Sequence, residues 1–224
     1  MGERVPYRGK DGFEINAYRA EPVGPTKGGV IVCQEIFGVN PYIEEVCDSY
    51  AKIGYAAIAP SLFDRVERGV SLDYSLENRD RGLKIAAQVD WDRALDDLEM
   101  ARDTLRLTGP KKVGVVGYCW GGSVAWLFAC RRQVDCAVAY YPSETSHFPD
   151  DHARHPVIMH IGEEDMVIPL GTIEQIKKDQ AGTPIYTYPG APHGFDNPGR
   201  QTYRADAAKL ARGRTLEFLA RHVG

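Results

Sequence analysis

The sequence lacks the features that mark membrane, secreted and nucleotide-binding proteins. No apolar run in its 224 residues is long enough to cross a bilayer, and residues 1–4 carry no apolar signal core. Its 27 Lys and Arg against 31 Asp and Glu give a formal net charge of −4, so we expect neither nucleic acid nor a membrane as partner. No G-x-G-x-x-G run follows a strand, and residues 117–122 have P-loop spacing but are followed by Ser123 in place of the lysine.

Cysteine is also scarce, and none of the five cysteines lie in C-x-x-C spacing. An odd number without that spacing argues against a disulfide framework and against a structural zinc site, and it favours a reducing cytoplasm. Cys33, Cys130 and Cys136 lie in apolar surroundings, so we expect them to pack as small hydrophobic side chains.

Apolar β-rich runs alternate with helical periodicity along the whole chain, without repeats or a break in composition. This alternation predicts a single α/β domain over residues 1–224, with a mostly parallel sheet covered by helices on both faces. The polar segment 61–90 is expected to be irregular, with a helix near its end, and residues 10–12 to form a hairpin turn. Strands are expected at 30–33, 55–59, 113–116, 136–141, 157–161 and 185–188, and helices at 42–52, 92–107, 170–179 and 202–220.

The segment GYCWGG at residues 117–122 joins an apolar strand to a helical pattern. It has the G-x-S-x-G nucleophile-elbow pattern with Cys119 in the serine's place. Gly117 and Gly121 allow neighbouring backbone segments to approach closely, and the helix N-terminus favours a thiolate or an oxyanion. The alternative is a Gly-rich strand–helix turn around an inert, buried cysteine.

In this kind of site the acid and then the histidine follow the nucleophile along the chain. His193 lies in a Gly- and Pro-rich loop after the strand at 185–188, as expected of a catalytic base. Asp165 follows the strand at 157–161 and precedes an apolar run that would bury it, so it is the expected acid. Asp196, near His193, is the competing choice.

The remaining histidines fit a catalytic role less well. His160 lies within a strand and is expected in the core. The loop holding His147, His152 and His155 also carries Asp150 and Asp151, but the spacing matches no standard metal site. We therefore expect a solvated loop, no metal and no organic cofactor.

These motifs together make the chain resemble the dienelactone hydrolase (carboxymethylenebutenolidase) family, a cysteine-dependent branch of the α/β-hydrolases. The resemblance runs from about residue 30 to residue 219, and its most specific match is QEIFGVN at 34–40, supported by YAAIAP at 55–60 and APHGF at 191–195. It implies an α/β-hydrolase fold and a carboxylic ester hydrolase that acts on a small activated lactone or enol ester in aromatic hydrocarbon catabolism. It also suggests a monomer.

The chemistry assigns a role to each site residue. Cys119 would attack the carbonyl, His193 would handle the proton, and Asp165 would orient His193. The backbone N–H groups of Ile36 and Trp120 are expected to form the oxyanion hole. Glu35 is either a simple strand-end charge or, as the resemblance implies, a group that holds the resting thiol until substrate displaces it.

The family's substrate carries a carboxylate, which calls for cationic side chains. Arg79 lies about where the family places one arginine. Arg81 is the alternative, because a shift of two residues in the match to the family would bring it to the same position. The family's second arginine falls at Asn197, and Arg200 is a possible substitute. Aromatic side chains that could line the pocket, or simply pack in the core, are Phe37, Trp120 and Tyr141.

Two other functions are compatible with the same residues. One is a promiscuous carboxylesterase for small neutral esters. The other is a hydrolase fold whose thiol binds or senses a ligand with little turnover.

Overall fold

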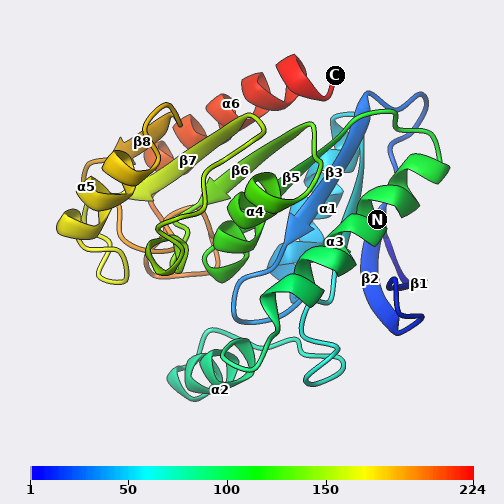
Figure 1. Ribbon diagram of the computed structural model, residues 1–224, viewed down its shortest axis with the longest axis horizontal. Helices are drawn as coiled ribbons and strands as arrows, with labels where there is room; N and C mark the ends of the chain where they lie inside the picture. The colour runs from blue at the N-terminus through cyan, green and yellow to red at the C-terminus, as the bar shows by residue number, and fades with distance from the viewer. Residues whose placement is uncertain (1) are drawn as a thin grey trace.

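One eight-stranded sheet, in the order β1-β2-β4-β3-β5-β6-β7-β8, runs through the part of the chain that the computed structural model describes, residues 2–224 (Figure 1). β1 pairs antiparallel with β2, and β2 antiparallel with β4, whereas the other neighbouring strands are parallel. The strands are β1 (Glu3–Arg8), β2 (Glu14–Ala20), β3 (Gly28–Cys33), β4 (Tyr55–Pro60), β5 (Val113–Tyr118), β6 (Cys136–Tyr140), β7 (Val157–Gly162) and β8 (Ile185–Tyr188).

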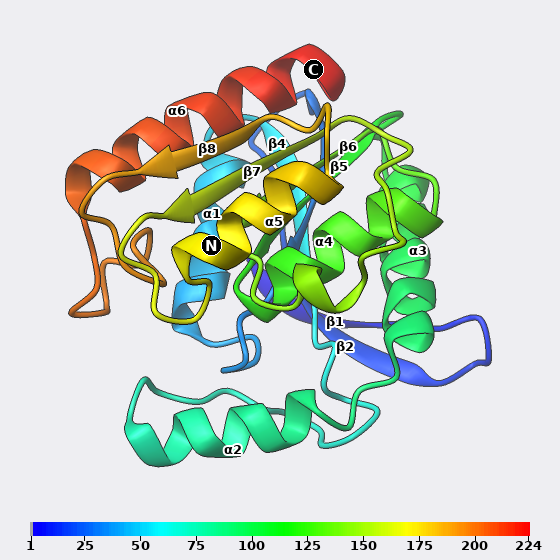
Figure 2. The ribbon, with the colours of Figure 1, turned by 60° about the vertical axis from the view of Figure 1, so that its left-hand side comes forward.

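Helices cover both faces of this sheet. α1 and α6 lie on one face and α3, α4 and α5 on the other, while α2 stands apart from both layers (Figures 1 and 2). The helices are α1 (Pro41–Lys52), α2 (Leu76–Ala86), α3 (Trp91–Leu107), α4 (Trp120–Arg131), α5 (Leu170–Asp179) and α6 (Ala205–His222), with a short 3₁₀ turn at Thr145–His147. The predicted α/β architecture is confirmed.

The core follows from the apolar runs in the sequence. Every residue of the five strands β3 to β7 is buried, as parallel strands between two helical layers must be. α4 is buried from Trp120 to Cys130, which makes it the central helix. Side chains of Asn40, Ser75 and Asp90 cap the N-termini of α1, α2 and α3.

Most of the expected elements are confirmed, with small differences at their ends. α6 begins at Ala205 rather than residue 202, because the backbone N–H of Arg204 bonds to the Phe195 carbonyl and holds the chain in a turn. β6 ends at Tyr140, since Tyr141 has a φ of 37°. In residues 2–224, no helix combines the length and apolar character needed to span a membrane.

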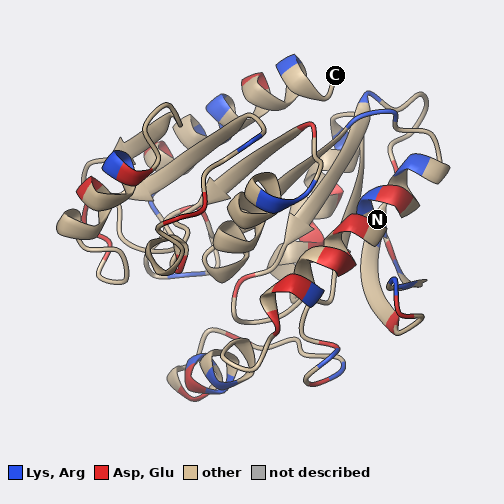
Figure 3. Ribbon diagram, in the orientation of Figure 1, with Lys and Arg blue, Asp and Glu red and all other residues tan. Residues whose placement is uncertain are grey.

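All five cysteines are free and buried, and the burial of Cys33, Cys130 and Cys136 agrees with the packing expected of these three. The charged side chains do not separate into blocks of one sign. Figure 3 shows basic and acidic residues interspersed along α2 and α3.

His160 is a core residue, as expected. Its ring is fully buried, with Nδ1 2.7 Å from the Tyr188 hydroxyl and Nε2 3.1 Å from the Thr215 hydroxyl. Burial, with a smaller effect of Arg214, lowers the pKa of His160 to about 3. The folded protein therefore holds this imidazole neutral over the whole neutral and mildly acidic range.

This neutral histidine predicts a pH dependence of stability. The unfolded chain takes up a proton on His160 as the pH falls below about 6.5, and the folded chain does not until about pH 3. Stability is thus lost between these values. Between pH 7 and pH 4.5 the free energy of unfolding should fall by about 2–3 kcal/mol more in the wild type than in His160→Gln.

Urea unfolding at the two pH values measures this difference. His152→Gln, a change at an exposed histidine, is the matched control and should keep the wild-type pH dependence. Equal pH dependence in wild type and His160→Gln would contradict the assignment.

Candidate active site

Cys119 lies in the sharp turn between β5 and α4. Its φ of 55° and ψ of −122° are strained for a side chain larger than glycine. A Cβ atom on Gly117 would overlap the Gly121 carbonyl, and one on Gly121 would overlap the Gln34 carbonyl. Gly117 therefore allows the crossing of β5 and α4 that the elbow requires, and Gly121 allows α4 to begin against the end of β3, in line with the predicted close approach of backbone segments.

His193 connects Cys119 to Asp165. Its Nε2 is 3.1 Å from the Cys119 sulfur, and its Nδ1 is 2.7 Å from Oδ2 of Asp165. The other Asp165 oxygen accepts hydrogen bonds from the backbone N–H groups of Val167 and Ile168. The three side chains come from the loops after β5, β7 and β8, at the carboxyl ends of the strands.

Asp196, the competing acid, lies elsewhere. Its carboxylate accepts a hydrogen bond of 3.1 Å from the Tyr42 hydroxyl, on the side of α1. Burial raises the pKa of Asp196 to about 6. Of the two candidate acids, Asp165 is the one hydrogen-bonded to the His193 ring.

The surroundings of His193 favour its charged form. Burial alone opposes a charge on His193, but the neighbouring Cys119 and the hydrogen bonds to Asp165 and Cys119 outweigh burial and raise the pKa of His193 to about 10. The arrangement thus favours a protonated imidazole next to the Cys119 sulfur. The Tyr141 ring packs edge-on against His193, with centroids 4.9 Å apart.

Glu35 is fully buried and is paired with other groups. Its carboxylate lies 3.1 Å from the Arg200 guanidinium and accepts hydrogen bonds from the Tyr74 hydroxyl at 3.1 Å and the Asn197 amide at 3.4 Å. Within the described residues the Cys119 sulfur instead contacts His193 and, at 4.0 Å, the Ser143 hydroxyl. That Glu35 holds a resting thiol stays a prediction.

The three candidate arginines lie in different surroundings. Arg200, whose side chain is only 20% exposed, sits against Glu35 and over the rings of Phe37 and Tyr74. Arg79 and Arg81 are exposed on α2, where they pair with the carboxylates of Asp80 and Glu67, respectively. The structure brings Arg200, and neither arginine of α2, into contact with the buried carboxylate.

The remaining predicted residues surround the triad. Trp120 starts α4 and packs in the core against Phe63 and Trp91, and Ile36 lies in the turn after β3. Tyr141 is fully buried, and among the described residues its hydroxyl has no hydrogen-bond partner.

Tyr74 and Ser143 were missed by the sequence analysis. Tyr74 receives hydrogen bonds from Asn40 and Asn197 while donating to Glu35, so it joins its own segment to the turn after β3 and to the loop after β8. It lies in the irregular stretch before α2, where no periodicity marks it. Only its position in the folded chain shows its contact with the site.

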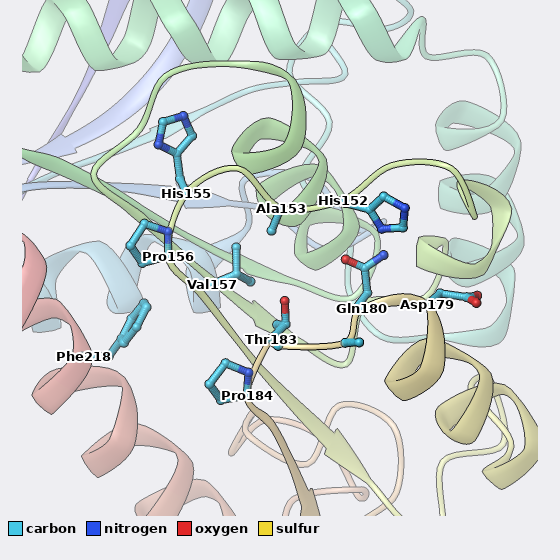
Figure 4. Close-up of a pocket in the computed structure, with 12 residues that line it drawn as sticks. His152, Ala153, His155, Pro156, Val157, Asp179, Gln180, Thr183, Pro184 and Phe218 are labelled. Carbon is cyan, nitrogen blue, oxygen red and sulfur yellow. The ribbon is translucent and has the colours of Figure 1, made fainter.

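A separate hollow of about 460 Å³ lies at the opposite end of the strands, before β7 and β8 (Figure 4). His152 and His155 line it, together with Gln180, whose buried amide is already bonded to Trp126 and to the Asp151 carbonyl. Within residues 2–224, no group of three or more His, Cys, Asp or Glu side chains is placed to hold a metal ion. In parallel sheets ligands bind at the carboxyl ends of the strands, so the Cys119 end is the candidate active site.

Strand order, elbow turn and the placement of His193 and Asp165 define an α/β hydrolase. The sequence profile of the Dienelactone hydrolase family matches residues 15–223. The chain is 32% identical over 230 residues to the carboxymethylenebutenolidase of Pseudomonas putida, covering 98% of this chain and 97% of that one. The chain belongs to the dienelactone hydrolase family.

Two further comparisons agree with this assignment. A candidate carboxymethylenebutenolidase of Synechocystis sp. is 36% identical over 214 residues, which cover 88% of this chain and 87% of that protein. The crystal structure of a candidate dienelactone hydrolase from Klebsiella pneumoniae superposes with a TM-score of 0.84 at 27% identity, and the match covers 99% of each chain.

The choice between the two acids can be tested by paired substitutions. Asp165→Asn should lower kcat for an ester by about 10²–10⁴-fold, because the amide no longer fixes the His193 tautomer or stabilises its charge. Asp196→Asn, the matched control, should keep kcat within about threefold, since its carboxylate bonds to Tyr42. Steady-state hydrolysis of p-nitrophenyl acetate measures both, and full activity in Asp165→Asn would refute the assignment.

Proposed function

We propose that the protein hydrolyses a small activated ester or lactone through an acyl-enzyme on Cys119. The observation that carries this proposal is the hydrogen-bonded row Cys119–His193–Asp165, with separations of 3.1 and 2.7 Å. Membership of a hydrolase family supports the same chemistry.

The geometry suggests how the reaction proceeds. The Cys119 thiolate adds to the ester carbonyl, and the N–H groups of Ile36 and Trp120 stabilise the oxyanion. The His193 imidazolium gives its proton to the departing alkoxide or enolate oxygen, leaving a thioester. His193 then takes a proton from water as the water attacks the thioester, and the acid product leaves with the thiolate restored.

The site favours small substrates with good leaving groups. Cys119 is only 8% exposed, so a large polypeptide could not bring its backbone to the sulfur without opening the site. An enolate or activated alkoxide leaves the tetrahedral intermediate more readily than an amine does, so the acyl-enzyme forms fastest from an activated ester. Lactones and enol esters meet both conditions.

Arg200 is the proposed contact for a substrate carboxylate. Of the three candidate arginines, Arg200 is the one beside the triad, and its guanidinium forms an ion pair with the Glu35 carboxylate. An incoming carboxylate would compete with Glu35 for that guanidinium, which can bind a carboxylate through two parallel hydrogen bonds. Asn197 is neutral, so this site offers one cation where the family resemblance implies two.

The Glu35–Arg200 pair also supports the second candidate function. Because the pair is already electrically balanced, a neutral ester can bind without displacing either partner. A promiscuous carboxylesterase would therefore use the same triad and leave Arg200 undisturbed. For either activity the free thiols favour a reducing compartment, and we propose the cytoplasm.

Steady-state turnover tests the proposal. The rates on cis- and trans-dienelactone and on p-nitrophenyl acetate should exceed those of Cys119→Ala, which serves as the blank. A burst of p-nitrophenol followed by no further release would instead identify a thiol that binds a ligand without turnover.

The role of Arg200 is tested by a selective loss. In a Glu35→Gln background, which avoids leaving a buried unpaired carboxylate, Arg200→Met should lower kcat/KM for dienelactone by about 10–100-fold, the worth of a hydrogen-bonded charge. The rate on neutral p-nitrophenyl acetate should stay nearly constant. Arg79→Met and Arg81→Met are matched controls, and a selective loss in either of them, with none at Arg200, would overturn the assignment.

A further inference from the structure

α2 lies beside the turn that holds Ile36. The helix stands apart from the two helical layers in Figures 1 and 2, and its buried residues are Gly82, Ile85 and Ala86. The rest of its surface is polar or exposed, including Leu76 and Leu83. This short buried face is therefore what docks α2 onto the body of the protein.

Gly82 is the point of closest approach. A Cβ atom added at Gly82 would overlap the carbonyl oxygen of Ile36 and lie 3.1 Å from its carbonyl carbon. The obstructing atoms belong to the backbone, so rotation of a side chain cannot relieve the overlap. Only glycine allows α2 to approach this closely to the Ile36 carbonyl group.

The chain leading into α2 is tied to the same turn. The Leu72 N–H bonds to the Phe37 carbonyl at 2.8 Å, Gly38 pairs with Ser71 in an isolated bridge, and the Asn40 amide bonds to the Leu72 carbonyl at 3.2 Å. The turn after β3 is thus fixed from two sides, by these hydrogen bonds and by the Gly82 contact. A displacement of α2 must move or strain the turn.

We infer that Gly82 is a positioning residue for the oxyanion hole, because its contact with the Ile36 carbonyl fixes the Ile36 backbone and, through the Ile36 Cα, the N–H on the other side of that residue. The inference rests on the proposed function, in which that N–H stabilises the oxyanion. The triad is held separately, because Cys119, His193 and Asp165 come from other loops and hydrogen-bond to one another.

This separation gives the inference a specific signature. An oxyanion donor acts on the transition state, so moving it lowers kcat and leaves KM nearly unchanged. Alkylation of a thiolate forms no oxyanion, so the reaction of Cys119 with iodoacetamide should not change. A general loss of structure would affect both reactions.

The test compares two glycine-to-alanine changes within helices. We express kcat per Cys119 thiol that iodoacetamide can alkylate. On this basis Gly82→Ala should lower kcat for p-nitrophenyl acetate by about 10–100-fold, a somewhat smaller effect than removing an oxyanion-hole donor altogether. Its KM and its iodoacetamide rate should stay within about twofold of wild type. Gly213→Ala in α6, where an added Cβ meets no atom within 4 Å, is the matched control and should keep the wild-type kcat.

Several outcomes would overturn the inference. An unchanged kcat in Gly82→Ala would do so, as would a parallel fall in kcat and alkylation rate. If Gly82→Ala does not fold, Ile85→Ala serves in its place, because it loosens the same buried face of α2 without creating an overlap. Ile85→Ala should reduce kcat and leave the alkylation rate of Cys119 unchanged, and an unchanged kcat would refute the inference. If neither the wild type nor Gly213→Ala turns over substrate, the proposed function is refuted and the inference with it. If both turn over substrate and Gly82→Ala is fully active, the inference alone is refuted.

Discussion

The crossing of β5 and α4 at the elbow is the constraint on which the site depends. β5 and α4 pass so closely there that a methyl group on Gly117 would overlap the Gly121 carbonyl. The start of α4 also lies so close to the end of β3 that a methyl group on Gly121 would overlap the Gln34 carbonyl. The crossing holds Cys119 at a positive φ and places it at the N-terminus of the most buried helix. Every other element of the site is arranged around that fixed sulfur, because β7 and β8 bring Asp165 and His193 to the same edge of the sheet.

Beside the triad lies a second group of buried charges with a different task. Glu35 and Arg200 neutralise each other, and Tyr74 and Asn197 satisfy the remaining carboxylate oxygen. A buried pair of this kind contributes little net stability, but it keeps a cation close to the reaction centre without leaving it unpaired. We interpret the pair as the part of the site that distinguishes substrates, while the triad performs the chemistry.

Much of the fold and of the triad could be predicted from the sequence because both leave local signals. The apolar runs mark the buried strands, and Cys119, His193 and Asp165 each follow such a run within a few residues. Tyr74 and Gly82 could not be predicted, because their importance comes from contacts with Glu35 and Ile36, which lie far away in the sequence. The same holds for the partner of Arg200, since a charge in a loop gives no sign of what it faces.

The central claim is that hydrolysis passes through a thioester on Cys119, and mass spectrometry can test it directly. Enzyme quenched with acid during turnover of p-nitrophenyl acetate should carry one acetyl group, located on the peptide that contains Cys119 and absent from Cys119→Ala. Continued turnover with no acyl group on that peptide, or turnover retained by Cys119→Ala, would contradict the account.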